Sequence, residues 1–274
     1  MADIESLSPT KAVYQSQGDL RSLHTKIIGV TQVSALTEVS RSLFKQALPD
    51  DPVVVTEETI FHVQGGGQPS DTGRMVVQSG GSNHPSFLVQ SVRRSGNGTI
   101  FHQGQLEPTD QNTSLQAGQL VEQLIDGEKR DLHSRIHSAG HLLGLAVRQL
   151  SSEIPNVNET KAQHYPDAAF VEFQGKIDPK HRDAIQKVLD DLVQQDLPIN
   201  VTWLDPQGLK ERGIFLPDAF HDPTPGGTRV VEIGELGGYP CGGTHVHSTA
   251  KLGRVVVGKI STKKGNTKIA YTVG

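Results

Sequence analysis

The chain has 274 residues with a formal net charge of -4, of which 35% are hydrophobic and 20% charged. This length is ample for a full hydrophobic core in one large or two ordinary domains, so small stapled folds are excluded. The composition also excludes collagen-like and disordered chains. A single cysteine, Cys241, cannot form an internal disulfide, which predicts a reducing compartment. No apolar run is long enough to cross a bilayer and the N-terminus lacks a signal-peptide pattern, so we expect a cytoplasmic protein without membrane contact.

The pattern of the first half of the chain predicts an all-β unit. Short apolar runs separated by polar turns lie at 26–30, 53–55, 60–62, 75–78, 87–89 and 99–102. Such runs predict a small barrel or sandwich. Leu36, Val39 and Leu43, with Phe44 and Leu48 beyond them, have helical spacing that ends at Pro49, which predicts a helix packed on this unit.

The second half mixes helices and antiparallel strands. Apolar residues from Leu132 to Leu150 recur every three or four positions, which predicts a helix with a buried stripe. A second helix is expected from Asp178-Pro179 to Pro198, and strands at 170–173, 201–204, 230–233, 254–260 and 268–273. The polar stretch 106–118 is the best candidate for a boundary. The sequence therefore predicts the α+β class, with a flexible N-terminus (1–10), a β-rich barrel-like domain (11–112) and an α+β domain (113–274).

Two short motifs carry the chemistry. His137 and His141 are four residues apart on the predicted helix, so their imidazoles project from one face and can share a metal ion. Cys241 stands four positions before His245 with two glycines between them. Three histidines and a cysteine are a nitrogen and sulfur donor set that suits zinc. Ser138 stands where a zinc peptidase has its glutamate, and the two pairs lie too far apart for a zinc finger, so both classes are disfavoured.

Several segments together resemble one known family. They are Arg-x-His-Ser-Ala-x-His-Leu-Leu (135–143), Arg-Val-Val-Glu-Ile-Gly (229–234), Pro-Cys-Gly-Gly-Thr-His-Val (240–246) and the glycine-rich Gly-Gly-Gly-Gln-Pro-Ser-Asp-Thr-Gly (65–73). They look like the editing domain of alanyl-tRNA synthetases and their freestanding relatives, the longer AlaX-type alanyl-tRNA editing proteins. The resemblance spans about 11–274. No ATP-binding or aminoacylation module precedes these motifs, so the chain is similar to a stand-alone editor that acts without ATP.

The resemblance implies hydrolysis of the ester that joins a wrong amino acid, serine or glycine, to tRNA(Ala). It implies a β-barrel-like N-terminal domain and an α+β editing domain of the kind shared with threonyl-tRNA synthetases. One zinc ion per chain would be held by His137, His141, Cys241 and His245. Candidate catalytic residues are His137, His141, Cys241 and His164. Candidate substrate-binding residues are Gly66, Gly67, Gln68, Gly140, Lys161 and Thr244.

The last segment of the chain is basic within an acidic whole. From Val246 onward there are six lysines or arginines and no acidic residue. We expect RNA contacts at Lys251, Arg254, Lys263 and Lys264, with binding that weakens as salt rises. The expected partner is mischarged tRNA(Ala), and the expected oligomeric state is a monomer.

One position departs from the family pattern. The family often has threonine before the second helix histidine, and this chain has Gly140. Removing a side chain beside a ligand predicts an enlarged pocket, with either weaker rejection of correctly charged alanyl-tRNA or acceptance of another mischarged tRNA.

Other readings stay open at the level of sequence. The ion can activate water or only position the substrate. The chain can also be a non-catalytic, zinc-stabilised tRNA-binding module, or a different zinc hydrolase that acts on small esters or amides.

Overall fold

The computed structural model describes residues 4–78, 85–107, 114–214 and 226–274. It is a mixed α+β protein with two compact units. The first comprises Met1–Gly65 and Pro69–Arg130, and the second Gly66–Gln68 and Asp131–Gly274. The predicted boundary at 112 and 113 falls outside the described residues, and the contacts divide the chain later, at Arg130. The division is later because a strand after residue 113 belongs to the first unit.

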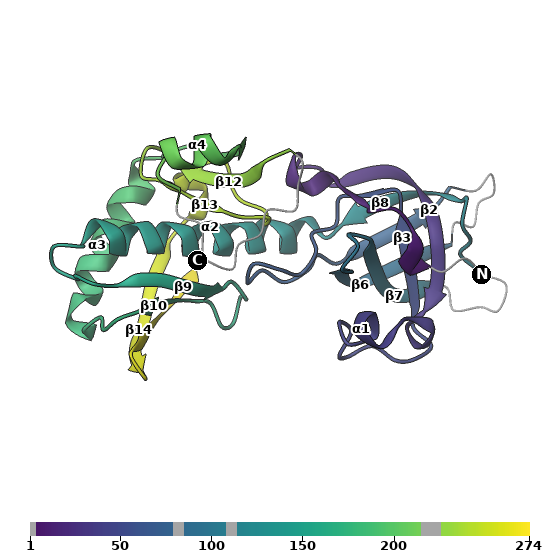
Figure 1. Ribbon diagram of the computed structural model, residues 1–274, viewed down its shortest axis with the longest axis horizontal. Coiled ribbons are helices and arrows are strands. Elements are labelled where there is room, and N and C mark those ends of the chain that lie inside the picture. The colour runs from purple at the N-terminus through teal and green to yellow at the C-terminus, as the bar shows by residue number, and fades with distance from the viewer. Residues whose placement is uncertain (1–3, 79–84, 108–113, 215–225) are drawn as a thin grey trace. The chain divides into compact units, whose positions relative to one another are not determined.

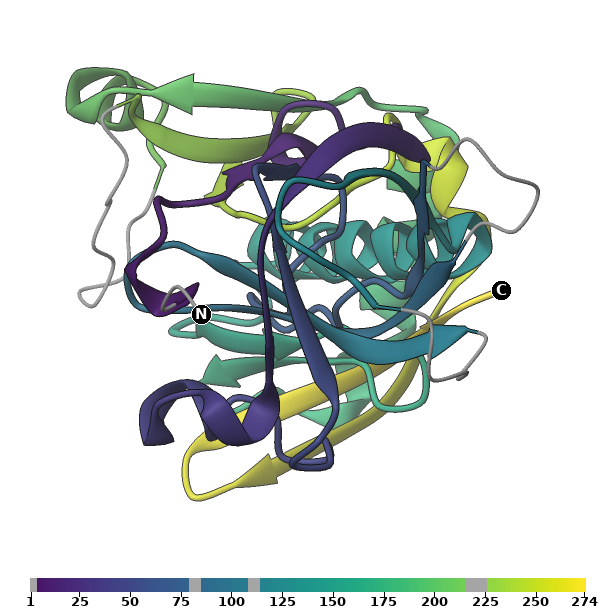
Figure 2. The ribbon, with the colours of Figure 1, turned by 90° about the vertical axis from the view of Figure 1, so that its right-hand side faces the viewer.

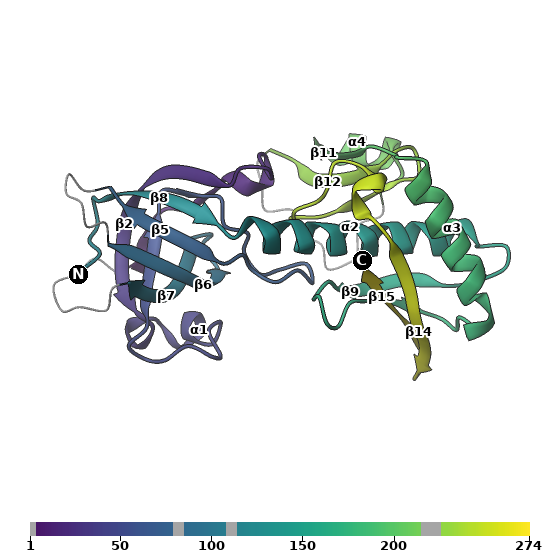
Figure 3. The ribbon, with the colours of Figure 1, turned by 180° about the vertical axis from the view of Figure 1, so that it is seen from behind.

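A closed six-stranded barrel forms the first unit (Figures 1, 2 and 3). Its strands in spatial order are β2 (Ser22–Gln32), β3 (Pro52–Thr56), β7 (Ile100–Glu107), β6 (Ser86–Arg94), β5 (Gly73–Val77) and β8 (Leu120–Ile125). Residues alternate between inside and outside, so Met75, Phe87 and Val121 are fully buried. Strand β8 was not predicted from the sequence; it pairs with β2 and β5 and closes the barrel.

The first unit also contains short elements outside the barrel. The parallel pair β1 (Lys11–Ala12) and β4 (Glu58–Thr59) forms a two-stranded sheet. The helix predicted from Leu36 to Leu48 is wrong in extent, because α1 covers only Glu38–Arg41. Val39 and Leu48 are 77% and 64% exposed, so only some of the apolar residues with helical spacing pack in the core.

The segment before the barrel is packed, although the sequence predicted flexibility for 1–10. Residues 1–3 lie outside the described part of the chain. Ile4 is buried in a small cluster with Val33 and Phe44. The Glu5 carboxylate accepts a hydrogen bond from the backbone N–H of Thr37 at 2.7 Å. One apolar side chain and one carboxylate therefore tie this segment down.

The second unit has three layers. Helix α2 (Gly127–Gln149) lies between two sheets (Figure 1). The four-stranded sheet has the order β14 (Val255–Lys263), β15 (Asn266–Val273), β10 (Phe170–Gln174), β9 (Asn158–Gln163), and the three-stranded sheet the order β11 (Ile199–Leu204), β12 (Thr228–Ile233), β13 (Gly238–Pro240). Core residues of α2 pack with both sheets, so the helix is buried around its circumference rather than along one stripe.

Helix α3 (Arg182–Gln194) packs on β14 in the same core through Ile185 and Leu189 (Figure 3). The Asp178 side chain caps the preceding 3-10 turn by accepting from the N–H of Lys180. A short helix, α4 (Pro206–Glu211), follows β11. Lys264 and Gly265 both have positive φ, as expected for the tight turn between β14 and β15. Among the described residues, no helix has the length and apolar character needed to cross a membrane.

Candidate metal centre in the second unit

Four side chains predicted as ligands meet in the second unit. His137 and His141 project from α2, and Cys241 and His245 from the loop after β13. One ligand atom from each lies within 4.8 Å of those of the other three. The Cys241 Sγ is 3.4 Å from Nε2 of His137 and 3.3 Å from Nε2 of His245. Residues 100 positions apart in sequence thus form one cluster.

The loop that carries Cys241 is held from both sides. The backbone N–H of Cys241 donates to the carbonyl of Arg229, and the Arg229 guanidinium donates to the carbonyl of Cys241. A Cβ at Gly243 would overlap the His137 ring and the Gln68 amide oxygen. Glycine at this position therefore lets the backbone approach the imidazole closely.

Gln68 fixes the orientation of His137. The Gln68 side chain is fully buried, and its Oε1 accepts from the backbone N–H of Thr244 at 3.1 Å. Because a backbone N–H can only donate, the Gln68 atom that it meets is the amide oxygen, which can only accept. The Nδ1 of His137 lies 2.7 Å from the same oxygen and must therefore carry a proton and donate to it. The lone pair of His137 is then on Nε2, which faces Cys241. The amide Nε2 of Gln68 donates to the Thr244 hydroxyl at 2.8 Å and completes the bridge.

The surroundings of the other three candidate ligands, His245, His141 and Cys241, also suit metal binding. The Nδ1 of His245 lies 3.0 Å from the Ser138 hydroxyl, which also accepts from the N–H of Val246. Burial, His164 and Arg229 lower the pKa of His141 to about 3, so its imidazole is neutral. Burial raises the pKa of the Cys241 thiol, and a coordinating metal would remove that proton.

The cluster fits a metal ion of the zinc type. His141 has a buried Nδ1 with no hydrogen-bond partner among the described residues, and neutral imidazoles with a thiol form a donor set that suits zinc. Polar side chains on the second nitrogens of His137 and His245 are the arrangement that orients histidine ligands.

His164 lies beside this cluster. It follows β9, is 1% exposed, and stacks on the His137 ring with centroids 4.2 Å apart. The Tyr271 hydroxyl donates to the carbonyl of Ile136 at 3.0 Å, so its oxygen accepts from the Nδ1 of His164 at 2.6 Å. This leaves the lone pair of His164 on Nε2. Burial lowers the pKa of His164 to about 4.

The structure contradicts the expectation that Gly140 enlarges the pocket. A Cβ at this position would overlap the His164 ring and the Tyr271 hydroxyl. The space left by the missing side chain is therefore occupied by these two groups, and the enlarged pocket expected from the sequence is wrong.

The remaining site predictions fall in different places. Gly66 and Gly67 have positive φ, and the carbonyl of Gly67 accepts from the N–H of His164 at 2.8 Å. Thr244 is buried against Gln68 and Ser134. Lys161 is exposed on β9 and pairs with Glu172 away from the cluster. The four basic residues are all exposed: Lys251, Arg254, Lys263 and Lys264.

Comparisons with known proteins point to the same family as the sequence motifs. Residues 228–269 match the family model described as the threonyl and alanyl tRNA synthetase second additional domain. The chain is 31% identical over 234 residues to the alanyl-tRNA editing protein AlaX-M of Methanosarcina barkeri, with 83% of this chain and 91% of the relative covered. The chain belongs to the AlaX-type alanyl-tRNA editing proteins.

Longer proteins match this AlaX-type chain over part of their length. It is 26% identical to AlaX-L of Pyrococcus horikoshii, covering 96% of this chain and 57% of that protein. It is 28% identical to the alanine--tRNA ligase of Halorubrum lacusprofundi, covering 81% of this chain and 23% of the ligase.

A second polar group in this AlaX-type site, Glu159 with Tyr239, was not predicted from the sequence. The Tyr239 ring lies 4.5 Å from that of His141, and its hydroxyl donates to Glu159 at 2.9 Å. Burial raises the pKa of Glu159 to about 7 against the opposing effects of Tyr239 and Arg148. A Cβ at Gly144 would overlap both Glu159 and Tyr239. Two glycines four apart, Gly140 and Gly144, were the signal in the sequence that bulky groups approach one helix face.

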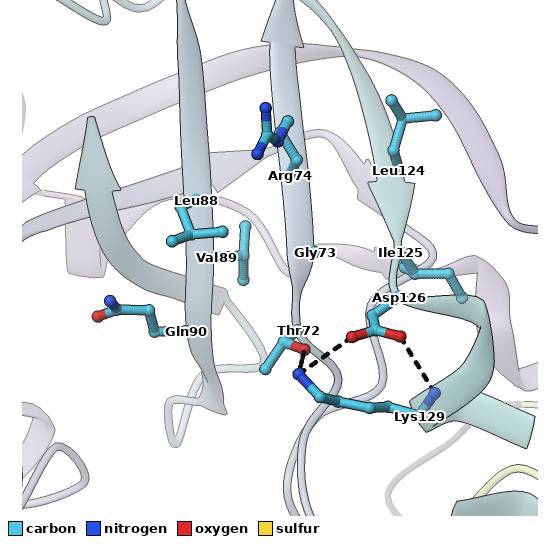
Figure 4. A pocket seen from close by; sticks show the side chains of 10 residues that line it. All are labelled: Thr72, Gly73, Arg74, Leu88, Val89, Gln90, Leu124, Ile125, Asp126 and Lys129. Atoms are coloured by element: carbon cyan, nitrogen blue, oxygen red, sulfur yellow. Dashed lines mark hydrogen bonds and ion pairs between the residues drawn. The ribbon is translucent and has the colours of Figure 1, made fainter. Parts of the chain in front are cut away.

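A separate cavity of about 400 Å³ lies on the barrel (Figure 4). Arg74, Leu88 and Leu124 form part of its wall, and Lys129 contacts Asp126 at 3.0 Å and Thr72 at 3.2 Å. Lys129, Asp126 and Thr72 thus bind one another, whereas Arg74 pairs with Glu107, which does not line the cavity.

Proposed function

We propose that this chain removes wrong amino acids from tRNA(Ala) in trans, by zinc-assisted hydrolysis of the seryl or glycyl ester. The observation that carries the proposal is the convergence of His137, His141, Cys241 and His245 on one point. Relatives named as alanyl-tRNA editing proteins support the substrate. One zinc ion per chain would be held by these four residues, or by three of them with a position free for water or substrate.

A zinc ion bound there would supply Lewis-acid chemistry for the hydrolysis of an ester that is already activated. The protein contributes orientation. Gln68 keeps the lone pair of His137 directed at the ligand cluster, and Ser138 contacts His245. The backbone of Gly66 and Gly67 and the Thr244 side chain line the same region and are proposed to contact the aminoacyl end, with Gly140 holding the space for His164.

His164 is our candidate for proton transfer, or for contact with the terminal ribose. Tyr271 keeps its Nδ1 protonated, so Nε2 is free to accept a proton or a hydroxyl hydrogen bond. We propose tRNA contacts at Lys161, Lys251, Arg254, Lys263 and Lys264.

Purified protein assayed with seryl-, glycyl- and alanyl-tRNA(Ala) tests the proposal. We expect rapid release of serine or glycine, slow release of alanine, and one zinc per chain by elemental analysis. His141→Ala should abolish turnover and zinc binding while circular dichroism shows a folded chain. Lys187→Gln, on the exposed face of α3, is the control.

The outcome separates the alternatives. Binding of tRNA without release of the amino acid would favour a zinc-stabilised RNA-binding module. Turnover of small esters or amides with no effect on charged tRNA would favour a different hydrolase. Full activity in His141→Ala would remove the metal centre from the mechanism.

A further inference from the structure

In the described part of the chain, helices α2 and α3 pack on one face of the four-stranded sheet of the second unit and leave its other face uncovered. Its inward side chains, such as Val171, Val257 and Ile269, pack in the core with α2 and α3. The register places Lys161, Glu172, Lys268 and Ser261 in one row across β9, β10, β15 and β14 on the opposite face. Alternation along each strand thus exposes a continuous outward surface.

This outward surface is positively charged. Its charged side chains are Lys161, Lys259, Lys263, Lys268 and Glu172, a formal charge of +3 from four lysines and one glutamate. The whole chain has a formal charge of -4. The sheet face therefore concentrates positive charge on an acidic protein, which is an electrostatic footprint for a polyanion.

Two of the lysines are held in place while staying accessible. Lys161 and Lys268 lie 3.5 Å and 3.7 Å from the Glu172 carboxylate, which is only 10% exposed, while the lysine side chains are 62% and 46% exposed. The Lys268 ammonium also lies 4.0 Å from the centre of the Phe170 ring. Because these lysines flank β10, their Cα atoms are roughly 10 Å apart, two strand spacings. Ordering before binding lowers the entropy cost of a contact.

The position of β9 connects this surface to the metal centre. β9 is an edge strand of the sheet, and His164 follows Lys161 by three residues, at most about 10 Å of extended chain. Lys161 is on the outward surface, whereas His164 stacks on His137. A strand of nucleic acid on the outward surface can therefore reach the ligand cluster around one edge of the sheet.

We propose that the outward face of the β14-β15-β10-β9 sheet binds the phosphate backbone of the tRNA substrate, with Lys161 and Lys268 as its central contacts. This rests on the proposed function and narrows its docking surface. Of the proposed tRNA contacts, Lys161 and Lys263 lie on this face, whereas Lys251 and Arg254 precede β14 and lie outside it. Lysines that carry point charges contact phosphates rather than base edges, so binding should be largely independent of sequence.

Anisotropy titration of uncharged tRNA(Ala) with the double variant Lys161→Gln/Lys268→Gln tests the surface. We expect affinity to fall about tenfold at low salt, and the slope of log Kd against log salt to fall by about one per lysine. The matched control is Lys187→Gln, because Lys187 is also exposed and paired with an acid, Asp191, but lies on α3. Unchanged binding in the double variant, or an equal loss in the control, would overturn the proposal.

Uncharged tRNA makes this test independent of catalysis. If the protein binds it through the two lysines but does not deacylate seryl-tRNA, the surface stands and the proposed function fails. If the protein deacylates seryl-tRNA, we expect KM to rise in the double variant with kcat retained. Wild-type KM in that variant would overturn the surface and leave the deacylase activity standing.

Discussion

Among single residues, Gln68 has the most direct effect on the predicted ligands. Gln68→Ala removes the acceptor for the Nδ1 of His137, so either nitrogen of that ring can then carry the proton. Loss of such a partner typically costs 10- to 100-fold in metal affinity, about 1.4 to 2.7 kcal/mol. Zinc competition with a chromophoric chelator measures it. Gln64→Ala, exposed in the same segment, should bind zinc like the wild type; equal affinity in both variants would contradict the role of Gln68.

Gly140 is a second residue whose substitution has a definite sign. In a helix, alanine is normally more stable than glycine by about 1 kcal/mol. Here a Cβ meets His164 and Tyr271, and overpacking costs typically 1 to 3 kcal/mol. We expect Gly140→Ala to lower the melting temperature. The comparison is Gly96→Ala, where a Cβ meets nothing within 4 Å; a Gly140→Ala protein more stable than wild type would show that the rings can move aside.

At the scale of elements, the glycine-rich segment is anchored by a buried ion pair. The Arg130 guanidinium contacts the Asp71 carboxylate, and both side chains are almost fully buried, at 0% and 1% exposed. Asp71 also accepts from the N–H of His62 at 2.6 Å. Asp71→Asn leaves the arginine charge uncompensated, which should cost about 3 to 5 kcal/mol.

Urea denaturation of the Asp71→Asn protein measures this loss. Asp126→Asn breaks an exposed pair with Lys129 and should cost less than about 1 kcal/mol. Similar losses in the two variants would mean that burial adds nothing to the Asp71 pair.

The β3–β7 pairing should weaken as pH falls. His102 on β7 contacts the Val54 carbonyl and the Thr59 hydroxyl, and burial lowers its pKa from 6.5 to about 4. The unfolded state takes up a proton first as pH drops below 6.5, so stability is lost between about pH 6.5 and 4. At pH 5 this amounts to roughly 2 kcal/mol.

Hydrogen exchange of β3 and β7 at pH 7.5 and pH 5, corrected for the intrinsic exchange rate, reads out this weakening. His102→Gln does not titrate in this range, so it should lose less opening free energy between the two pH values than the wild type. Equal losses would assign the pH dependence to other groups.

For the whole molecule, metal binding should stabilise the second unit, because all four candidate ligands belong to it. Zinc at 100 times its Kd adds about 2.7 kcal/mol. Trp203, the single tryptophan, lies in β11 and reports on this unit by fluorescence. We expect chelation to shift the Trp203 transition to lower urea while amide exchange in the barrel strands is retained. An unchanged Trp203 transition would mean that no ion is bound there.

Local patterns predicted much of this architecture and failed where distant residues decide. Spacing placed His137 with His141 and Cys241 with His245, and the cluster follows from both. Short apolar runs predicted a barrel or a sandwich, and the family resemblance implied the barrel, but β8 was missed because its register depends on β2 and β5. The helix after Leu36 was too long because periodicity does not report which side chains reach the core. Glu159 and Tyr239 were missed because neither belongs to a sequence motif and they lie 80 residues apart in the chain.

The placement of Gln68 has a consequence for anyone who shortens this protein. A fragment beginning at Asp131 would retain every donor side chain of the cluster but lack the amide that steers one of them. Solvent would have to enter the vacated space and satisfy both His137 and the backbone of Thr244. Such a fragment, even if well folded, should hold its ion more loosely, and supplying residues 64–72 as a free peptide offers a route to restore it.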